Sequence, residues 1–457
     1  MKINTAILPE DLSSALSRFW ALSGQKIESI ENNYDFGSGS PVFTRDGNYT
    51  AMGWTEWTEG FVYGSYFLQF DATGDDKFLE IGKKHTVGRM ASHVSHIGVH
   101  DHGFNNLSCY GNWLRMIREG KIEGTKGDID FCELALKVSG AVQASRWSKT
   151  HEGGGYIYSF NGPHSLFVDT IRSCRILMVA HFLGHSLMGE NDSPVSLLQR
   201  AVQHITSTAK YNIFYGEGRD SYDEWGRTAH EAVFNTNDGR FRCPNAQQGF
   251  SGLTTWTRGL SWAMVGFSEE LEFIETLEDK SFADLGGKEA FKQICLKGAK
   301  ATCDWFIKNT ATDGITYWDG GAPNLHRLGD WRNEISNPFN GWEPIDSTAA
   351  AIGAQGLLRF GRYLGLDSED GQKYWQAGLT SMQSLLTTPY LSEDENHQGL
   401  LLHSIYHQPN GWDNIPEGQK IACCESSLWG DYHIREAALY LQRIINDEPY
   451  YTFFGCL

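Results

Sequence analysis

The sequence lacks any run of about 18 apolar residues, the length that a helix needs to cross a bilayer. Its beginning, MKINTAILPEDLSSALSRFW, has one lysine and no apolar core of the kind a signal peptide carries. The nine cysteines contain no C-x-x-C pair, and only Cys423 and Cys424 are adjacent. An odd count without framework spacing is typical of reduced thiols and argues against a zinc ribbon. We therefore expect a cytoplasmic protein, or a periplasmic one if a signal peptide has been removed.

Positive charge is also scarce, because 38 Lys and Arg residues face 56 Asp and Glu residues and the net charge is −18. A nucleic-acid partner would need a basic face, so the sequence argues against one, and nothing in it indicates a membrane partner. An anionic substrate would be repelled at long range, and its binding would depend on a few local cations. Aromatic residues are abundant at 13%, with 15 Trp. Most of them are expected in the core, and the rest could cover sugar rings in a cleft.

Helical periodicity runs through most of the chain, whereas strand-like alternation is sparse. Short segments such as TGDDKFLEIGKKH and DGQKYWQAGLTSM place Gly, Asp or Ser before an apolar-periodic run, as capped helix starts do. We predict twelve helices, most of them in pairs joined by such turns. They span approximately 9–30, 60–71, 76–93, 105–119, 127–146, 167–184, 193–210, 254–275, 287–309, 347–365, 370–388 and 426–445.

The stretches between these pairs are longer and are rich in Gly, Asn, Trp and His. Helix pairs whose long loops meet at one end form either an open α-solenoid or a closed ring of six inner and six outer helices. A solenoid usually keeps a fixed repeat, whereas the helix pairs here are spaced irregularly. We therefore predict the closed form, an all-α (α/α)6 toroid, with residues 1–457 in a single domain.

Two aspartates stand where inner helices are predicted to begin, Asp101 in GVHDHGFNN and Asp169 in HSLFVDTIRSCR. Taken singly, each is more often a cap on backbone N–H groups. If the inner helices all begin at one end of the ring, however, both side chains project into one cavity. Two carboxylates in an aromatic-lined pocket would have pKa values pushed apart, as general acid–base catalysis at neutral pH requires. We therefore expect Asp101 and Asp169 to be the catalytic residues.

Arg258 and His230 are each open to two interpretations. Arg258, in the WTRG segment, could bind a substrate carboxylate through two guanidinium N–H groups, or could pair with a buried carboxylate of the protein. His230, in RTAHEAVFN, fits a packed core histidine as well as it fits a substrate contact. The sequence alone does not decide between these alternatives.

A metal site is a further alternative near Asp101. His93, His96, His100 and His102 precede or flank this aspartate, and residues three or four apart share a helix face. No second H-x-x-E-H or E-x-x-H element accompanies them, and Gly98 would end a helix here. We therefore expect surface and supporting histidines, and no metal.

Six segments together carry a family resemblance. They occur in order as WTEGFVYG, HDHGF, VDT, QGFS…TWTRGLSW, EPIDSTAAAIGAQGLL and ESSLWGDYHIREAAL, and they cover nearly the whole chain. In this combination the sequence resembles glycoside hydrolase family 88, the unsaturated glucuronyl hydrolases, which fold as (α/α)6 barrels. Thr257, Leu260 and Ser261 depart from the family pattern, which is close to W-A-R-G-Q-x-W. The loop from Lys210 to Ala246, with its own motif GEGRDSYDEWGRTAH, is a further departure.

The resemblance implies a hydrolase that needs no cofactor. Its substrate would be an acidic oligosaccharide with a 4,5-unsaturated glucuronyl residue at the non-reducing end. Asp169, kept protonated through the like charge of Asp101, would donate a proton to C4, and water would add at C5. Carried over by position, the substrate contacts would be Trp57, His230, Gln248, Trp256 and Arg258.

Two alternatives to this activity remain. One is a glycosidase for saturated β-glucuronides, in which Asp101 and Asp169 form a conventional carboxylate pair. The other is a helical-repeat scaffold that binds peptides in an open groove. The sequence is compatible with a monomer or a small homo-oligomer in each case.

Overall fold

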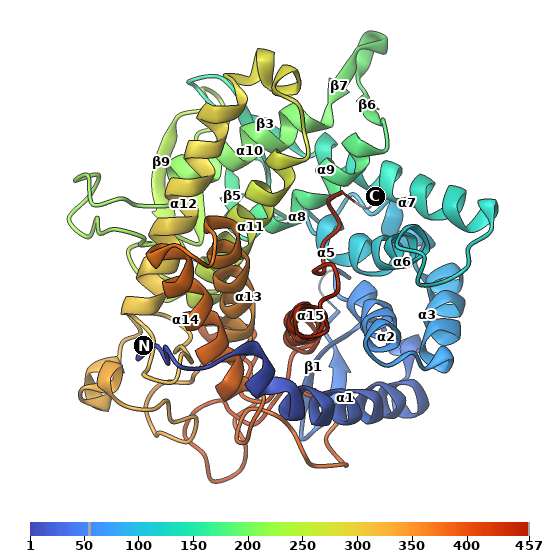
Figure 1. Cartoon of the computed structure of the whole chain (residues 1–457). Coiled ribbons are helices and arrows are strands. Elements are labelled where there is room, and N and C mark those ends of the chain that lie inside the picture. The colour runs from blue at the N-terminus through green and yellow to red at the C-terminus, as the bar shows by residue number, and fades with distance from the viewer. Residues whose placement is uncertain (54–55, 456–457) are drawn as a thin grey trace.

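The computed structural model describes residues 1–53 and 56–455 of the chain. Trp54 and Thr55, next to the first segment of the family resemblance, lie outside the described residues. The structure is a ring of inner and outer helices with long connections between them (Figure 1). No helix among the described residues is both long enough and apolar enough to span a bilayer.

Six helical segments form the inner ring. They are α2 (Glu59–Thr73), α5 with α6 (His102–Asn106 and Asn112–Arg118, joined by the π turn Leu107–Gly111), α8 with α9 (Thr170–Ser173 and Arg175–Phe182), α11 (Thr257–Glu275), α13 (Ser347–Leu364) and α15 (Leu428–Ile445). Each contacts the next in chain order, and α15 contacts both α13 and α2, which closes the ring.

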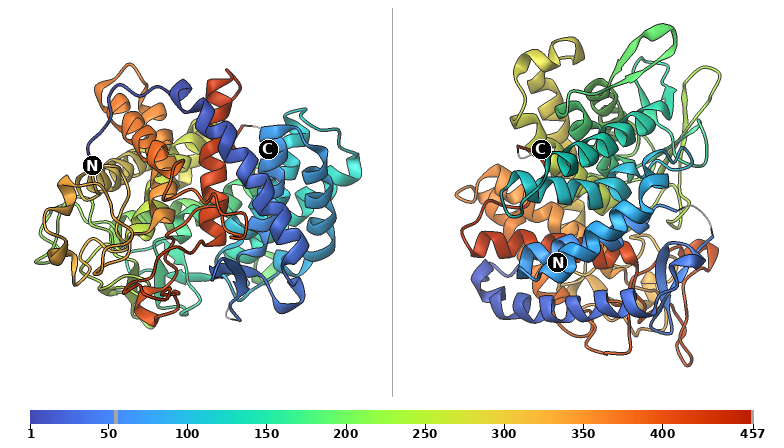
Figure 2. Two further views of the ribbon diagram at one scale, coloured as in Figure 1. Left: turned by 90° about the horizontal axis from the view of Figure 1, so that it is seen from below. Right: turned by 90° about the vertical axis from the view of Figure 1, so that its right-hand side faces the viewer.

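Six further helices cover the outside of this ring. They are α1 (Ser13–Asn33), α3 (Asp76–Arg89), α7 (Lys126–Ser145), α10 (Leu197–Tyr211), α12 (Lys288–Lys308) and α14 (Glu369–Leu385). The short helix α4 (Ala91–Val94) follows α3. The predicted twelve-helix (α/α)6 toroid is therefore confirmed. In the right-hand view of Figure 2, most of the long connections gather on one side of the helices.

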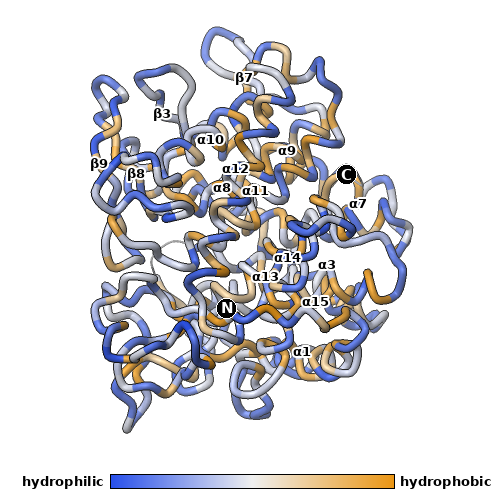
Figure 3. The backbone as a smooth tube through the Cα atoms, turned by 60° about the vertical axis from the view of Figure 1, so that its left-hand side comes forward, coloured by the Kyte–Doolittle hydropathy of each residue, from blue (hydrophilic) through white to orange (hydrophobic). Residues whose placement is uncertain are grey.

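Burial explains the different patterns of the two layers. The outer helix α10 buries Leu198, Ala201, Val202 and Ile205 on one stripe, as expected for an amphipathic helix on a core. The inner helix α13 is buried from Ser347 through Gly361, because helices cover it on both sides. One hydrophobic cluster extends from the N-terminal to the C-terminal segment of the chain. In Figure 3 hydrophobic stretches follow the helices and hydrophilic stretches follow the peripheral loops.

The long connections contain short antiparallel strands that the sequence analysis missed. The pairs are β1 (Pro41–Arg45) with β2 (Asn48–Ala51), β3 (Trp147–Lys149) with β4 (Gly155–Ile157), and β6 (Ser186–Met188) with β7 (Pro194–Ser196). A three-stranded sheet has the order β5 (Ser165–Phe167), β8 (Glu231–Phe234), β9 (Phe241–Asn245). The predicted starts of two helices, at 167 and 193, were therefore wrong, because β5 and β7 occupy these positions. Strands of three residues are too short for an alternating pattern to reveal them.

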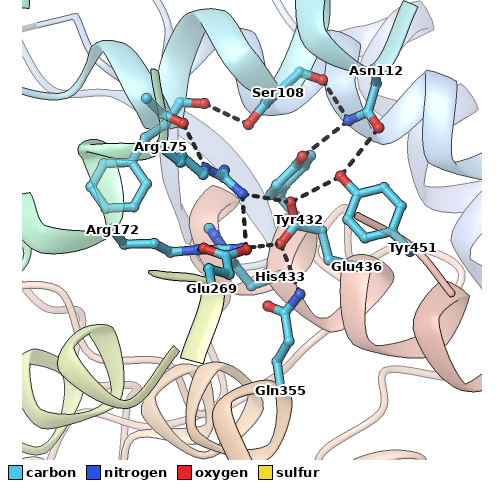
Figure 4. A network of polar contacts seen from close by, with 12 residues as sticks. Ser108, Asn112, Arg172, Arg175, Glu269, Gln355, Tyr432, His433, Glu436 and Tyr451 are labelled. Carbon is cyan, nitrogen blue, oxygen red and sulfur yellow. Dashed lines mark hydrogen bonds and ion pairs between the residues drawn. The ribbon is translucent and has the colours of Figure 1, made fainter. Parts of the chain in front are cut away.

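A network of buried ions joins four inner segments near the axis of the ring (Figure 4). Arg172 of α8 donates two hydrogen bonds of 2.9 Å to Glu269 of α11 and one of 2.7 Å to Glu436 of α15. Arg175 of α9 lies 3.5 Å from Glu436, and Gln355 of α13 donates to the same carboxylate. All four oxygens of the two glutamates have partners, since Tyr451 also donates to Glu436. This network ties the inner helices together below the cavity described next.

Candidate active site

A cavity of about 720 Å³, counted to its open mouth, lies at the end of the ring where the inner helices begin. Its lining is mostly aromatic and comes from the starts of the inner helices and the connections before them. The lining residues are Trp57, Asp101, Phe104, Phe160, Phe167, Asp169, Gln247, Gln248, Trp256, Arg258, Trp262, Tyr406, His407, Asn410 and Trp412.

The two predicted catalytic aspartates meet in this cavity. Asp101 directly precedes α5 and Asp169 directly precedes α8, yet neither side chain caps its helix by a hydrogen bond. Both are nearly buried, with 4% and 8% of their surface exposed. An oxygen of each carboxylate and a ring nitrogen of His100 lie within 4.8 Å of one another. The capping interpretation of these two residues was therefore wrong for both.

His100 lies between the two carboxylates. Its Nε2 is 3.2 Å from Oδ2 of Asp169 and 3.7 Å from Oδ1 of Asp101. His230 approaches Asp169 from β8, with Nε2 at 3.6 Å from Oδ1. Nδ1 of His230 accepts a hydrogen bond from the backbone N–H of Gln247 at 3.0 Å, which leaves the ring proton on Nε2. The N–H of His230 therefore points at Asp169.

The pKa values of the two aspartates are pushed apart, as expected, but in the opposite order from the prediction. Burial raises the pKa of Asp101 to about 6, and the charge of Asp169 adds to this while that of His100 opposes it. Burial also acts to raise the pKa of Asp169, but the hydrogen bond from His100 and the close approach of His230 outweigh it and hold that pKa below its usual range. The expectation that Asp169 is the protonated residue of the unliganded site was therefore wrong. The two histidines that cause the difference lie far from Asp169 in sequence.

Four polar atoms of this cluster have no hydrogen-bond partner among the described residues. They are Oδ2 of Asp101, Oδ1 of Asp169, Nδ1 of His100 and Nε2 of His230, and all of them are buried. A buried polar atom without a partner costs about 1–3 kcal/mol, so proteins retain few of them. Their concentration beside one cavity is typical of a site that completes its hydrogen bonds with a bound molecule.

Gln248 and Arg258 form a second polar group on the cavity wall. Arg258 pairs with Asp346 at 2.7 Å and donates to the carbonyl of Tyr406 at 2.7 Å and to Oε1 of Gln248 at 2.8 Å. The ion-pair alternative for Arg258 is therefore present, and the residue lines the cavity as well. Its guanidinium lies 4.7 Å from the ring centroid of Trp256, a cation–π contact.

Trp57 and Trp256 form aromatic walls of the cavity. Trp57 stacks on Trp429 with ring centroids 5.2 Å apart and an interplanar angle of 26°. The ring of Trp256 packs against His230, with centroids 4.6 Å apart. All of the predicted substrate contacts except His230 line the cavity, and His230 reaches it through Asp169.

The four histidines of the metal alternative do not converge on Asp101. Nε2 of His93 lies 3.1 Å from Glu59, and Nε2 of His102 bonds to the carbonyl of His96 at 2.9 Å. Of the four, His100 alone joins Asp101 and Asp169, and this trio is close enough to offer three ligand atoms to a cation. The four-histidine interpretation was therefore wrong.

The sequence analysis missed one complete wall of the cavity. Tyr406, His407, Asn410 and Trp412 come from the connection before α15, which the sequence marked only as one of the long stretches rich in Gly, Asn, Trp and His. Asp413 shapes this wall by accepting a hydrogen bond of 2.8 Å from the backbone N–H of His407. No periodicity marks these residues, and the only signal in the sequence is a Trp in a Gly- and Asn-rich segment.

The motif GEGRDSYDEWGRTAH of the long loop after α10 lies mainly outside the cavity. Asp223 accepts hydrogen bonds from the backbone N–H groups of Gly216, Glu217 and Arg219, which folds the segment on itself. Trp305 of α12 donates a hydrogen bond of 2.8 Å to Glu224. Only His230, at the end of the motif, reaches the catalytic aspartates.

No family model matches the chain. Among curated proteins, it is 25% identical over 427 residues to the unsaturated glucuronyl hydrolase of Bacillus sp. strain GL1, covering 91% of this chain and 94% of that protein. It is 23% identical to the unsaturated chondroitin disaccharide hydrolase of Streptococcus agalactiae, covering 86% and 82% of the two chains.

Solved structures give the same result for the fold. The crystal structure of the Bacillus sp. GL1 unsaturated glucuronyl hydrolase superposes with a TM-score of 0.69 at 20% identity, covering 94% of this chain and 97% of that one. The likeness therefore includes nearly all of the helical ring, not a local motif. Over nearly its whole length, the chain is therefore similar in sequence and in fold to unsaturated glucuronyl hydrolases.

Proposed function

We propose that the protein is a glycoside hydrolase that removes a 4,5-unsaturated glucuronyl residue from the non-reducing end of an acidic oligosaccharide. The observation that carries this proposal is the cluster of Asp101, His100 and Asp169, with unpartnered carboxylate oxygens beside an aromatic-lined cavity. Curated relatives of nearly full length carry the names of unsaturated glucuronyl and chondroitin disaccharide hydrolases, in agreement with this proposal.

The proposed reaction adds water across the C4=C5 double bond of the unsaturated sugar. Asp169 donates a proton to C4, and positive charge develops at C5. The same carboxylate then takes a proton from a water molecule, whose oxygen bonds to C5. The resulting hemiketal opens and releases the remainder of the oligosaccharide. Trp57 and Trp256 provide flat faces for the sugar rings.

The pKa order of the unliganded site requires a proton source for Asp169. Asp101 holds a proton up to a pH of about 6, and His100 lies between the two carboxylates. In our proposal His100 passes a proton from its Nε2 to Asp169 when the substrate binds, and Asp101 replaces it. A bound uronate favours this transfer, because its negative charge and the exclusion of water both raise the pKa of a nearby carboxyl.

Local cations offset the negative charge of the chain at this cavity. Burial lowers the pKa of His100, but the charge of Asp101 and the hydrogen bond to Asp169 outweigh it and raise that pKa. Arg258 contributes a second positive charge at the cavity wall, shared with Asp346. We propose that Gln248 binds the uronate carboxylate or its neighbouring oxygens, and that the positive charges of His100 and Arg258 attract it.

The rival activity, hydrolysis of saturated β-glucuronides, fits this geometry less well. An inverting carboxylate pair needs a separation of about 6.5–9.5 Å, whereas oxygens of Asp101 and Asp169 lie within 4.8 Å of each other. A retaining pair must flank the scissile bond, but here His100 occupies the space between the two carboxylates. Hydration of a double bond needs only one acid–base group on one side of the ring.

A side-by-side assay tests the proposal. An unsaturated glucuronyl disaccharide made by a polysaccharide lyase and its saturated counterpart are offered at equal concentration. We expect loss of the ultraviolet absorbance of the unsaturated uronate, and release of the aglycone from that substrate alone. Release from the saturated disaccharide at a comparable rate would overturn the proposal in favour of the conventional glycosidase.

A further inference from the structure

A cluster of nitrogen and sulfur atoms lies outside the catalytic residues, in the connection before α15. It consists of His403, Cys423 and Cys424, each of which offers one ligand atom within 4.8 Å of the others. The two sulfur atoms are 3.5 Å apart, and no disulfide joins them. Two thiolates at the Zn–S distance of about 2.3 Å in a tetrahedron would lie about 3.8 Å apart. The spacing of the two cysteines is therefore close to that of a shared metal ion.

His403 is oriented as metal-bound histidines usually are. Its ring bonds to the backbone of Pro389, and its Nδ1 accepts the N–H of Cys424 at 3.0 Å. The ring proton is therefore on Nε2, where the backbone of Pro389 accepts it, and the lone pair of Nδ1 faces Cys424. A cation bound at Nδ1 would have to displace this hydrogen bond from the Cys424 N–H.

The backbone of the cluster is held in an unusual conformation. His403 has φ = 67° and Cys424 has φ = 68°. The other non-glycine residues with positive φ in the described part of the chain are all Asp or Asn, which tolerate this region. Such conformations persist where the surroundings enforce them, and they gather at binding sites. Here they turn two of the three donor side chains toward each other.

The surroundings are compatible with a bound cation. His403 and Cys423 are each 2% exposed, and the rings of Phe339 and Tyr390 pack on the imidazole at 5.1 and 5.9 Å. Cys424 is partly exposed, which leaves a path from solvent to the fourth coordination position. Two sulfurs and one imidazole nitrogen form a soft donor set that favours thiophilic cations over Mg²⁺ or Ca²⁺.

We propose that His403, Cys423 and Cys424 form a binding site for a thiophilic divalent cation of the zinc type. Binding forms two metal–sulfur bonds and one metal–nitrogen bond, and the two thiol protons go to solvent. The site takes no direct part in the hydrolytic reaction, because none of its three donor residues lines the cavity.

Occupancy would stiffen one wall of the catalytic cavity. The backbone N–H of Ser404, next to His403, donates to the carbonyl of Glu425, next to Cys424, at 2.9 Å. The carbonyls of Ile405 and Tyr406 then hold the guanidinium of Arg258. A cation that links His403 to the two cysteines therefore fixes the strand of chain that carries Tyr406. We expect bound Zn²⁺ to raise Tm and to change KM more than kcat.

Cobalt provides a direct probe of the sulfur ligands. The full chain, reduced and freed of metal with a chelator, is titrated with Co²⁺. We expect one equivalent to bind, with a sulfur-to-cobalt charge-transfer band that Zn²⁺ abolishes. The variants Cys423→Ser, Cys424→Ser and His403→Asn should each weaken binding by at least about 100-fold, because loss of even an outer-shell partner costs 10- to 100-fold. Asn suits the positive φ of position 403.

A matched control is Cys243→Ser, which removes an exposed cysteine of β9 outside the cluster and should leave the band unchanged. Alkylation of unaltered protein supplies a measurement that does not depend on the variants folding. Zn²⁺ should protect Cys423 and Cys424 from the reagent but leave Cys243 reactive. The proposal is overturned if reduced protein shows no band and no protection, or if the two cysteines form a disulfide that persists under the reductant.

Discussion

Two clusters of buried ionisable side chains lie in the ring of helices: the axial network around Glu269 and Glu436, and the cluster of Asp101, His100 and Asp169. They differ in whether their carboxylate oxygens have hydrogen-bond partners. In the axial network each oxygen of Glu269 and Glu436 has a partner, and the charges of Arg172 and Arg175 hold the pKa values of both glutamates low against the effect of burial. In the cluster of Asp101, His100 and Asp169, one oxygen of each aspartate has no hydrogen-bond partner among the residues that the structure describes.

Burial is similar in both clusters, so burial does not separate a structural from a catalytic role. The difference is that the carboxylates of Asp101 and Asp169 border a cavity, while every oxygen of Glu269 and Glu436 accepts a hydrogen bond from a guanidinium, amide or hydroxyl group. A saturated buried ion pair stabilises geometry, and breaking it costs several kcal/mol. An unsaturated cluster costs stability and leaves capacity for a ligand. Substitutions in the two clusters should therefore have opposite effects.

The largest expected effect is on catalysis at Asp169. Replacing it by Asn removes the group that donates and accepts the proton, and such groups contribute about 10²–10⁴-fold. We expect Asp169→Asn to lower kcat by at least about 10²-fold in protein that still folds, and to lower Tm at neutral pH, because the lowered pKa of Asp169 stabilises the folded state there. The loss of ultraviolet absorbance from an unsaturated disaccharide measures the rate. Asp130→Asn, at an exposed pair with Lys126, serves as the control and should be fully active. Retained activity in Asp169→Asn would contradict the assigned role.

The axial network should respond in stability instead. Glu436→Gln leaves Arg172 and Arg175 with one fewer buried negative charge, and breaking such a pair costs about 3–5 kcal/mol. Urea unfolding should show this loss, with kcat per folded molecule nearly unchanged. The matched control is Glu448→Gln, which removes a half-exposed partner of Lys121 and should cost at most about 1 kcal/mol. Equal effects of the two changes would remove the distinction between the clusters.

Replacing Asp101 by Asn should stabilise the folded protein at alkaline pH. The pKa of Asp101 is raised to about 6 from an ordinary value near 4, so folded protein binds this proton more tightly than unfolded protein. Stability is therefore lost as pH rises through this window. Asp101→Asn cannot ionise, and we expect it to unfold at a higher urea concentration at pH 8, by about 1–3 kcal/mol. At pH 4 the difference should nearly vanish. A destabilised variant at pH 8 would contradict the raised pKa.

The last expected effect is on the pH profile of the unaltered enzyme. Because the proton on Asp101 is the reserve for Asp169 in our proposal, kcat/KM should fall above a pH of about 6, by about tenfold per pH unit. Initial rates at low substrate concentration give this profile directly. If kcat/KM stays constant up to pH 8, Asp101 does not supply the proton for Asp169, and its remaining role would be in substrate binding.

The sequence by itself was sufficient to predict the ring architecture and to predict that Asp101 and Asp169 face one cavity. Helical periodicity is a local property, so i, i+3 and i, i+4 spacing revealed the twelve helices, and the placement of Asp101 and Asp169 before inner helices followed. The short strands β5 and β7 escaped because a strand of three residues has too little pattern, and the partner of β5 is β8, more than sixty residues away.

Only the tertiary structure decided which aspartate of the site holds a proton, and which residues form the cavity wall that sequence patterns did not predict. The pKa of Asp169 depends on His100 and His230, which lie on different elements and approach to 3.2 and 3.6 Å. Coulomb energies and hydrogen bonds change steeply over such distances, and no spacing along the chain encodes them. Tyr406 likewise reaches the cavity through a connection without periodicity. Local pattern therefore identified which carboxylates meet, and nonlocal contacts determined which of them holds the proton.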